Sequence, residues 1–230
     1  LLVTFNPRYI HTAFGLRCLL ANLGEFRSRA QILEFDLDKR PLDAAEDILA
    51  REPKLVGIGV YIWNAEPCAE LVGLLKALRP DLPLVLGGPE VSHETEAQAM
   101  VQTADYVVLG EGELAFRDLC RALLAGERPR DKLIPGGLPP LAGLVSPYDC
   151  YQDKDIAQRL IYVEASRGCP FRCAFCLSAL DQRVRAFPLE RFLADMDSLF
   201  QRGVRHFKFV DRTFNLSIPT ASAILDFFLD

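Results

Sequence analysis

The sequence contains no long uninterrupted run of apolar residues, although half of its 230 residues are hydrophobic. A membrane-spanning helix needs about 18 or more such residues, and no basic stretch followed by an apolar one opens the chain as in a signal peptide. The formal net charge of −5 has the wrong sign for broad attraction to nucleic acid or anionic lipid. We therefore expect a cytoplasmic protein with no membrane or general nucleic-acid binding, whose partners are small molecules or a specific protein.

An initiator methionine is missing at Leu1, and the chain stops at Asp230 within a segment of apolar periodicity, so we expect both ends to be trimmed. Cysteine, by contrast, occurs seven times. An odd number argues against a disulfide framework, which a chain of this length does not need for stability. Three of the cysteines fall in expected helices and are predicted to be buried small hydrophobes: Cys18, Cys68 and Cys120.

The first half of the chain alternates short β-branched and aliphatic runs with helical periodicity, the pattern of repeated βα units. Strands are expected at residues 1–5, 30–35, 55–60, 84–86 and 106–109. Helices are expected at residues 15–23, 42–51, 67–78, 94–103 and 113–125. Five strands with helical crossovers predict an α/β, Rossmann-like, doubly wound parallel sheet, whose ligand site lies at the carboxyl ends of its strands.

A stretch rich in proline and glycine at residues 128–147 indicates a linker, which we predict at residues 128–158. Beyond it, a strand at 160–165, a helix at 189–202, a strand at 204–210 and a helix from Pro219 repeat the βα order. The expected organisation is therefore a first domain at 1–127, the linker at 128–158, and a second domain at 159–230.

Three cysteines stand within eight residues of the second domain, in the order Cys169-Pro-Phe-Arg-Cys173-Ala-Phe-Cys176. Such a loop can wrap three corners of an iron–sulfur cube, whose irons are normally filled by four thiolates. The nearest other cysteine, Cys150, lies beyond a predicted strand, which leaves the fourth iron open. Structural zinc and unpartnered core cysteines are the alternatives. Zinc sites usually close with a fourth Cys or His, and none follows at suitable spacing, since His206 lies on a predicted strand.

The segment from Gly168 to Cys176 resembles the cluster motif of the radical S-adenosylmethionine (SAM) superfamily. The resemblance implies a (β/α)₆ barrel, of which residues 159–230 would be the N-terminal part of a truncated whole. It also implies that the three cysteines ligate a [4Fe–4S] cluster, whose open iron chelates SAM and passes it an electron.

The same resemblance implies three contacts with SAM. Phe175 would place its backbone against the adenine, and Asp211 and Thr213, after the second barrel strand, would face the amino group. The Gly-Gly-Glu often found at that place in the superfamily is absent. A turn or N-cap role for Asp211 therefore stays open.

Residues that follow the predicted strands of the first domain form a second candidate site, at the edge of the sheet. Gly87 and Gly88 would let a ligand approach the backbone closely. The aromatic rings of Tyr61 and Trp63 either cover the ligand or pack in the core. The full set of candidates is Asn6, Tyr9, His11, Gly15, Tyr61, Trp63, Gly87, Gly88, Pro89, Glu90 and Glu111.

The order and spacing of these residues resemble the cobalamin-binding domain of B12 enzymes, whose pattern runs Asp-x-His-x-x-Gly, a Ser-x-Leu turn and Gly-Gly. The resemblance implies that the candidates line a cobalamin site. Aligned on Gly15, however, the ligand histidine of the family falls on Thr12, so His11 is one residue out of register, a turn of about 100° on a helix. In this respect the motif is similar to the subgroup that holds cobalamin without a protein histidine. Pocket lining, cobalt ligation and a structural role all stay open for His11.

Together the resemblances imply a cobalamin-dependent radical SAM enzyme with an external one-electron reductant and a small-molecule or peptide substrate. SAM would be cleaved to a 5′-deoxyadenosyl radical, which would act on an unactivated carbon before methyl transfer from methylcobalamin. Cyclisation or rearrangement, as in the anaerobic magnesium-protoporphyrin monomethyl ester cyclases, stays open. Two alternatives remain: a radical SAM oxidoreductase whose first domain binds no cobalamin, and a zinc-stabilised binding module.

Overall fold

The computed structural model describes residues 1–176 and 183–229. The chain divides into two compact units, Leu1–Pro139 and Pro140–Asp230, and each is described by itself. The division into residues 1–127, a linker at 128–158 and residues 159–230 stays a prediction about the domains. No helix within the described part of the chain is long and apolar enough to cross a membrane.

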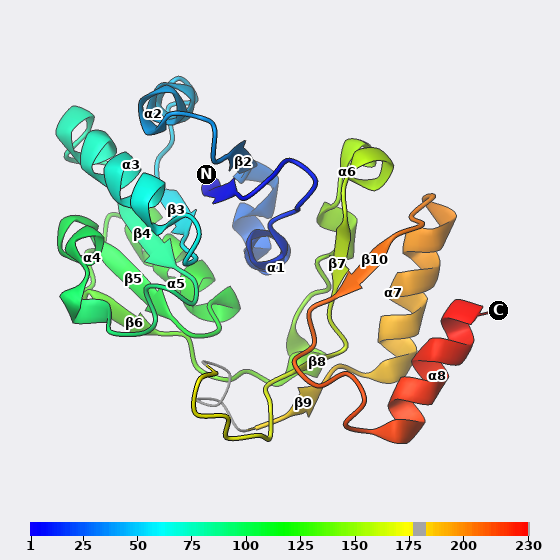
Figure 1. Ribbon diagram of the computed structural model, residues 1–230. Helices are drawn as coiled ribbons and strands as arrows, with labels where there is room; N and C mark the ends of the chain where they lie inside the picture. Colours follow the sequence, from blue (N-terminus) through cyan, green and yellow to red (C-terminus); the bar gives the residue numbers. More distant parts are fainter. Residues whose placement is uncertain (177–182, 230) are drawn as a thin grey trace. The chain divides into compact units, whose positions relative to one another are not determined.

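The first unit is built on one parallel sheet of six strands in the order β2-β1-β3-β4-β5-β6 (Figure 1). The strands are β1 (Leu2–Asn6), β2 (Ile32–Asp36), β3 (Val56–Gly59), β4 (Leu84–Gly87), β5 (Tyr106–Leu109) and β6 (Leu133–Pro135). The α-helices are α1 (Phe14–Ala21), α2 (Pro41–Leu49), α3 (Ala65–Leu78), α4 (Ala99–Thr103) and α5 (Glu113–Leu124), with 3₁₀ turns at Gly24–Arg29 and Thr95–Ala97. The predicted Rossmann-like α/β fold is confirmed.

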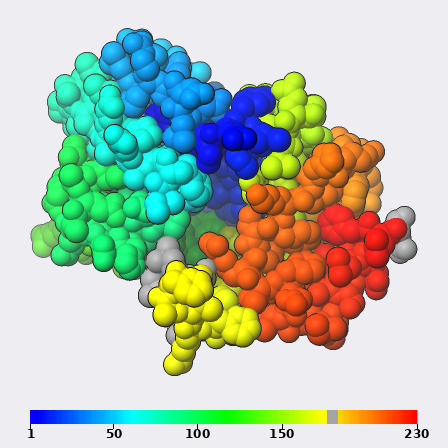
Figure 2. Space-filling model, in the orientation of Figure 1, coloured from blue at the N-terminus to red at the C-terminus, as the bar shows by residue number. Residues whose placement is uncertain are grey.

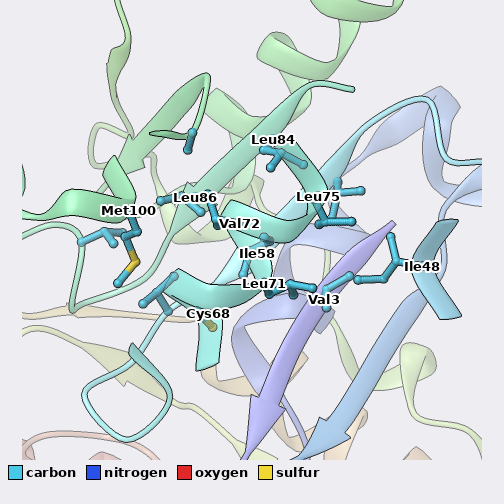
Figure 3. Close-up of a cluster of buried hydrophobic side chains, with 14 of the residues drawn as sticks. Val3, Ile48, Ile58, Cys68, Leu71, Val72, Leu75, Leu84, Leu86 and Met100 are labelled. Atoms are coloured by element: carbon cyan, nitrogen blue, oxygen red, sulfur yellow. The ribbon is translucent and has the colours of Figure 1, made fainter. Parts of the chain in front are cut away.

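Helices cover both faces of this sheet. Successive strand residues point to opposite sides, so each face carries apolar side chains that must be buried. One buried cluster joins α2, α3 and α4 to one face, as Figure 3 shows; it includes Val3, Ile48, Ile58, Cys68, Leu71, Val72, Leu75, Leu84, Leu86 and Met100. A second cluster joins α1 and α5 to the opposite face, with Leu2, Leu16, Val85, Val108, Phe116 and Leu119. With both faces covered, a ligand reaches the sheet only at its ends.

Strand β6 is an addition to the five predicted strands, and it lies among residues expected to be a linker. It pairs with β5 through Leu133, Ile134 and Pro135. Three residues beside a glycine pair are too few to display a strand pattern, and Pro135 is tolerated because β6 is an edge strand. The helix expected at 94–103 likewise begins only at Ala99, since Glu94 has a left-handed backbone with φ +48°.

All strands run parallel, but the side of the sheet on which successive strands are added changes at β1. The strand β2 lies on one side of β1, and β3 lies on the other side. In open α/β sheets such a switch point opens a crevice at the carboxyl ends of the strands. The loops after β1 and β3 lie at this switch point.

The second unit begins a βα barrel with two parallel strands, β7 (Ile161–Val163) and β10 (Phe207–Phe209). Two short antiparallel strands, β8 (Ser166–Arg167) and β9 (Arg185–Ala186), form a separate pair. The helices are α6 (Asp153–Gln158), α7 (Leu189–Gln201) and α8 (Ile218–Leu229), with 3₁₀ turns at Leu141–Gly143 and Tyr148–Cys150. The order β7, α7, β10, α8 agrees with the predicted start of a (β/α)₆ barrel.

Phenylalanines pack the two long helices of this unit on the strand pair. The ring centroids of Phe192 in α7 and Phe209 in β10 are 5.9 Å apart. Those of Phe207 in β10 and Phe228 in α8 are 5.0 Å apart. This packing holds the carboxyl ends of β7 and β10 at a fixed spacing.

Candidate functional site

The sequence-predicted residues of the first unit all lie on or beside the carboxyl edge of the sheet. Asn6 ends β1 and Gly87 ends β4, Gly15 lies in the first turn of α1, and the other candidates follow β1, β3, β4 or β5 within a few residues. Because every strand of this sheet is parallel, these ends meet at one edge. The structure therefore brings the predicted set to one place, as the βα order indicated.

A carboxylate from the neighbouring strand organises the loop after β1. Glu34, in the middle of β2, accepts a hydrogen bond from Asn6 Nδ2 at 3.0 Å and another from the backbone N–H of Ala13. Its other oxygen pairs with Arg17 of α1, at 2.9 Å between Nη2 and Oε2, and both side chains are almost fully buried. Arg17 also donates to the Ala13 carbonyl at 3.1 Å. This buried network holds both ends of the loop.

The network also fixes the backbone of His11. Asn6 Nδ2 donates to the His11 carbonyl at 2.9 Å, and the His11 side chain is half-buried. The neighbouring Tyr9 and Ile10 are 49% and 45% exposed. The loop therefore presents apolar side chains outward from a polar base.

Asn64 performs a similar task for the loop after β3. Its side chain is fully buried and donates to the Phe5 carbonyl at 2.9 Å and to Thr4 Oγ1 at 3.0 Å, both in β1. Its Oδ1 accepts the backbone N–H of Tyr61 at 2.7 Å. One amide thus ties the ends of β1 and β3 together across the switch point.

The loop that Asn64 holds carries a stacked pair of aromatic rings. Tyr61 and Trp63 lie 4.6 Å apart with an interplanar angle of 7°. Burial raises the pKa of Tyr61 to about 12, so the phenol stays neutral. Trp63 remains 46% exposed and the intervening Ile62 79% exposed. The stack is anchored on one side and open to a ligand on the other.

In the Gly87–Gly88 pair, the requirement for glycine comes from chain packing at Gly88 and not from the approach of a ligand. Gly88 has φ +114°, and a Cβ there would lie 2.3 Å from the Val60 carbonyl oxygen. Gly87 has ordinary space, with its nearest such contact at 3.6 Å from the Val108 carbonyl oxygen. The reason for glycine at position 88 is therefore its left-handed backbone and the close approach of Val60.

Ser92 joins the loops that follow β4 and β5. Its hydroxyl donates to the Gly88 carbonyl at 2.8 Å and accepts the backbone N–H of Gly110 at 3.1 Å. Glu111, next in the chain, is half-buried at the same edge, whereas Glu113 is buried in the first turn of α5. The edge as a whole offers exposed aromatic and aliphatic groups over a polar, hydrogen-bonded base, which fits a large flat ligand with apolar faces and polar substituents.

The three-cysteine loop of the second unit is at the surface. Cys169 is half-buried, and Cys173 and Cys176 are exposed; Figure 2 shows this stretch in yellow. The backbone N–H of Cys176 donates to the Cys173 carbonyl at 3.1 Å, and Phe175 between them is 96% exposed. Three thiols in one short turn fit an iron–sulfur cluster in the chemistry of their donors.

No three His, Cys, Asp or Glu side chains of residues 1–176 and 183–229 are already grouped as a metal site. Metal ligands commonly gather when the metal binds, since binding is coupled to local folding. Both Cys173 and Cys176 are exposed at the surface of this unit.

The base of this loop is tightly closed. Ser166 pairs with Ala186, and Arg167 pairs with Arg185, in the β8–β9 ladder. Gly168 has φ +87°, and a Cβ there would lie 2.0 Å from the Arg183 carbonyl oxygen. Only glycine fits this position, directly before Cys169.

The remaining two predicted residues follow β10. Asp211 accepts hydrogen bonds from the Ala165 backbone N–H at 3.0 Å and from Ser166 Oγ at 2.7 Å. Thr213 Oγ1 is buried and has no hydrogen-bond partner among the described residues. An unsatisfied buried hydroxyl is costly, and it fits a site completed by a polar ligand.

Several residues of these sites were missed by the sequence analysis, among them Arg17, Glu34 and Ser166. Glu34 carries the clearest signal, because a carboxylate interrupts the apolar strand Ile32–Asp36. The others are polar residues whose partners lie far away in the chain, so no local pattern reveals them.

The B12 binding domain family matches residues 1–120. An uncharacterized methyltransferase of Pyrococcus horikoshii is 28% identical over 199 residues, which cover 76% of this chain and 43% of the relative. The cobalamin-dependent radical SAM methyltransferase TokK of Streptomyces tokunonensis is 26% identical, with 72% of this chain and 28% of TokK covered. The chain thus spans less than half the length of these relatives.

A solved structure of the radical SAM methyltransferase TsrM from Kitasatospora setae, with cobalamin and a [4Fe–4S] cluster bound, shares the fold. The TM-score is 0.72 at 22% identity, covering 98% of this chain and 49% of TsrM. The six-stranded parallel sheet agrees with the family match. The chain belongs to the B12 binding domain family.

Proposed function

We propose that this chain is the cofactor-binding part of a cobalamin-dependent radical SAM methyltransferase. The observation that carries the proposal is the three-cysteine loop on the unit that follows a B12-binding domain. The names of the relatives, which are methyltransferases, favour methyl transfer over cyclisation or rearrangement.

In this proposal the second unit holds the cluster and SAM. The thiolates of Cys169, Cys173 and Cys176 ligate three irons, Phe175 offers its backbone to the adenine, and the buried Thr213 hydroxyl meets a polar group of SAM. An external one-electron reductant and a small-molecule substrate complete the reaction. When bound, the cluster would supply the electron that cleaves SAM, and cobalamin would carry the methyl group.

The first unit would hold cobalamin over the crevice between β1 and β3. Trp63, stacked on Tyr61, offers a flat apolar surface, and Tyr9 lies on the opposite loop. His11, half-buried in the loop after β1, would line this site. Residues that border the same edge are Gly15, Gly87, Gly88, Pro89, Glu90 and Glu111.

Anaerobic reconstitution with iron and sulfide tests the cluster. We expect the reconstituted protein to be brown, with the broad visible absorbance of a thiolate-bound iron–sulfur cluster, and to contain acid-labile sulfide. Cys173→Ala should abolish most of this absorbance and most of the bound sulfide. Cys150→Ala, a half-buried cysteine of the same unit outside the loop, is the matched control and should retain both. Bound zinc without sulfide in the wild-type protein would refute the proposal in favour of a zinc-stabilised module.

Hydroxocobalamin binding, followed by corrin absorbance after gel filtration, tests the first unit. Trp63→Ala should weaken binding by about tenfold or more, as expected for loss of a stacking aromatic surface. Leu78→Ala, at the other end of α3 and 53% exposed, should bind as the wild type does. A protein that holds a cluster but no corrin would leave only the radical SAM oxidoreductase alternative.

A further inference from the structure

We propose that Asp211 is a positioning residue that fixes the entry of the three-cysteine loop, with Ser166 as its partner. This inference rests on the proposed cluster site and adds residues that neither ligate the cluster nor belong to its motif. It also gives Asp211 a role different from the direct SAM contact that the superfamily resemblance implies.

The carboxylate of Asp211 uses both oxygens within the protein. Oδ2 accepts the backbone N–H of Ala165 at 3.0 Å, and Oδ1 accepts the hydroxyl of Ser166 at 2.7 Å. Hydrogen bonds to a carboxylate are stronger than those between neutral groups. Asp211 thereby joins the segment after β10 to residues that precede Cys169 by only three and four positions.

The other contacts at this base make the Asp211 bonds effective. Val210 N donates to the Val163 carbonyl at 2.9 Å, which holds the end of β10 beside the end of β7. Phe187 N donates to the Ala165 carbonyl at 3.0 Å on the β9 side. Ala165 is therefore held through its N–H by Asp211 and through its carbonyl by Phe187, so its peptide units have little freedom.

Arg167 completes the rigid base on the side of the chain nearest Cys169. Its Nε donates to Glu164 Oε2 at 2.8 Å, and its guanidinium lies 5.6 Å from the ring centroid of Phe187. Gly168 also lies close to the Arg183 carbonyl. These contacts at the base of the loop fix the direction in which the chain enters Cys169. Residues that orient metal ligands from outside the ligand set typically affect metal affinity by about 10- to 100-fold.

Four variants separate positioning from direct SAM contact. Asp211→Ala removes both hydrogen bonds, and Ser166→Ala removes one. Asp211→Asn removes the charge but can keep both bonds, because its oxygen accepts from Ala165 and its amide donates to the Ser166 hydroxyl, which is also an acceptor. The double variant Asp211→Asn with Ser166→Ala loses that compensation. Asp226→Ala, on the exposed surface of α8, is the control.

The readouts are iron and sulfide per chain after desalting, the electron paramagnetic resonance g values of the reduced cluster, and its midpoint potential. We expect Asp211→Ala to lower cluster retention by about tenfold, with shifted g values and potential in the remainder. Ser166→Ala should show a smaller loss, Asp211→Asn should retain more cluster than Asp211→Ala because both hydrogen bonds can persist in weaker form, and the double variant should lose this rescue.

The outcomes that contradict the inference are distinct from failure of the proposed function. If the wild type binds a cluster, and Asp211→Ala and Ser166→Ala keep its content, g values and potential, the positioning role is wrong. Weakened SAM binding in Asp211→Asn with an unchanged cluster would make Asp211 a direct SAM contact instead. A wild-type protein without any cluster would overturn the proposed function and this inference together.

Discussion

The hydroxyl of Tyr151 takes the place of a neighbouring strand on β7, since it donates to the carbonyl of Tyr162 at 2.8 Å and accepts its backbone N–H at 3.1 Å. Tyr148 makes the same pair of bonds to Glu164, at 3.3 and 3.2 Å. Two tyrosines three residues apart thus satisfy alternate backbone groups along the edge of β7 that faces away from β10. This edge is closed to further strand pairing without a strand of its own.

Tyr151→Phe should therefore destabilise the second unit. Removing one hydroxyl leaves two backbone groups without their partner, at a cost of about 1–3 kcal/mol in the free energy of unfolding. Tyr148→Phe removes longer bonds and should cost less. Urea denaturation followed by circular dichroism measures both, and equal stability of Tyr151→Phe and wild type would contradict the edge role.

The buried pair of Arg17 and Glu34 should be essential to the first unit. Glu34→Ala leaves the Arg17 guanidinium buried without its carboxylate, a change that typically costs about 3–5 kcal/mol. Cobalamin binding should weaken as well, because Asn6 and the loop after β1 lose their anchor. Glu25→Ala breaks the exposed pair with Arg121 and is the control, with stability close to wild type. Similar denaturation midpoints for the two variants would contradict this prediction.

The same substitution at two glycines should have opposite effects. Gly88→Ala places a methyl group against the Val60 carbonyl oxygen in a left-handed backbone, and should destabilise by about 1–3 kcal/mol. Gly73 lies within α3, where a Cβ meets nothing within 4 Å, so Gly73→Ala should stabilise by about 0.5–1 kcal/mol. Thermal unfolding of both variants decides the matter, and a stabilised Gly88→Ala would refute the packing argument.

Alkaline pH should destabilise the first unit. Burial raises the pKa of Cys68 from 9.0 to about 12. The unfolded thiol therefore loses its proton at lower pH than the folded one, and this deprotonation lowers the free energy of the unfolded state relative to the folded state. The contribution of the Cys68 thiol to the free energy of unfolding is fully present below about pH 9. It is lost as the pH rises from about 9 toward 12, by about 1.4 kcal/mol per pH unit for one group.

Cys68→Ala isolates this contribution. The variant should be less stable than wild type at pH 7, because it loses a buried side chain, and the difference should narrow between pH 9 and 11. Urea midpoints at several pH values give the comparison. A difference that stays constant with pH would show that the thiol does not carry the effect.

The repeated βα pattern was sufficient to predict the sheet class and to place Tyr61, Trp63 and Gly88 at one edge. Those features depend on strand ends, which hydrophobic periodicity locates within a few residues. Strand β6 was not predictable, because Leu133–Pro135 forms a strand only through its pairing with β5. The interrupted start of α4 likewise depends on the left-handed backbone of Glu94.

By itself the sequence determined the α/β class, the edge of the sheet where the candidate residues gather, and the three-thiol loop, because each is encoded in spacing along a short stretch. The tertiary structure alone decided which polar groups support those sites. Glu34 meets Arg17, Asn64 meets Thr4, and Asp211 meets Ser166. Such pairs depend on strands being brought side by side, and only the packing of the folded chain determines which distant side chains then face each other.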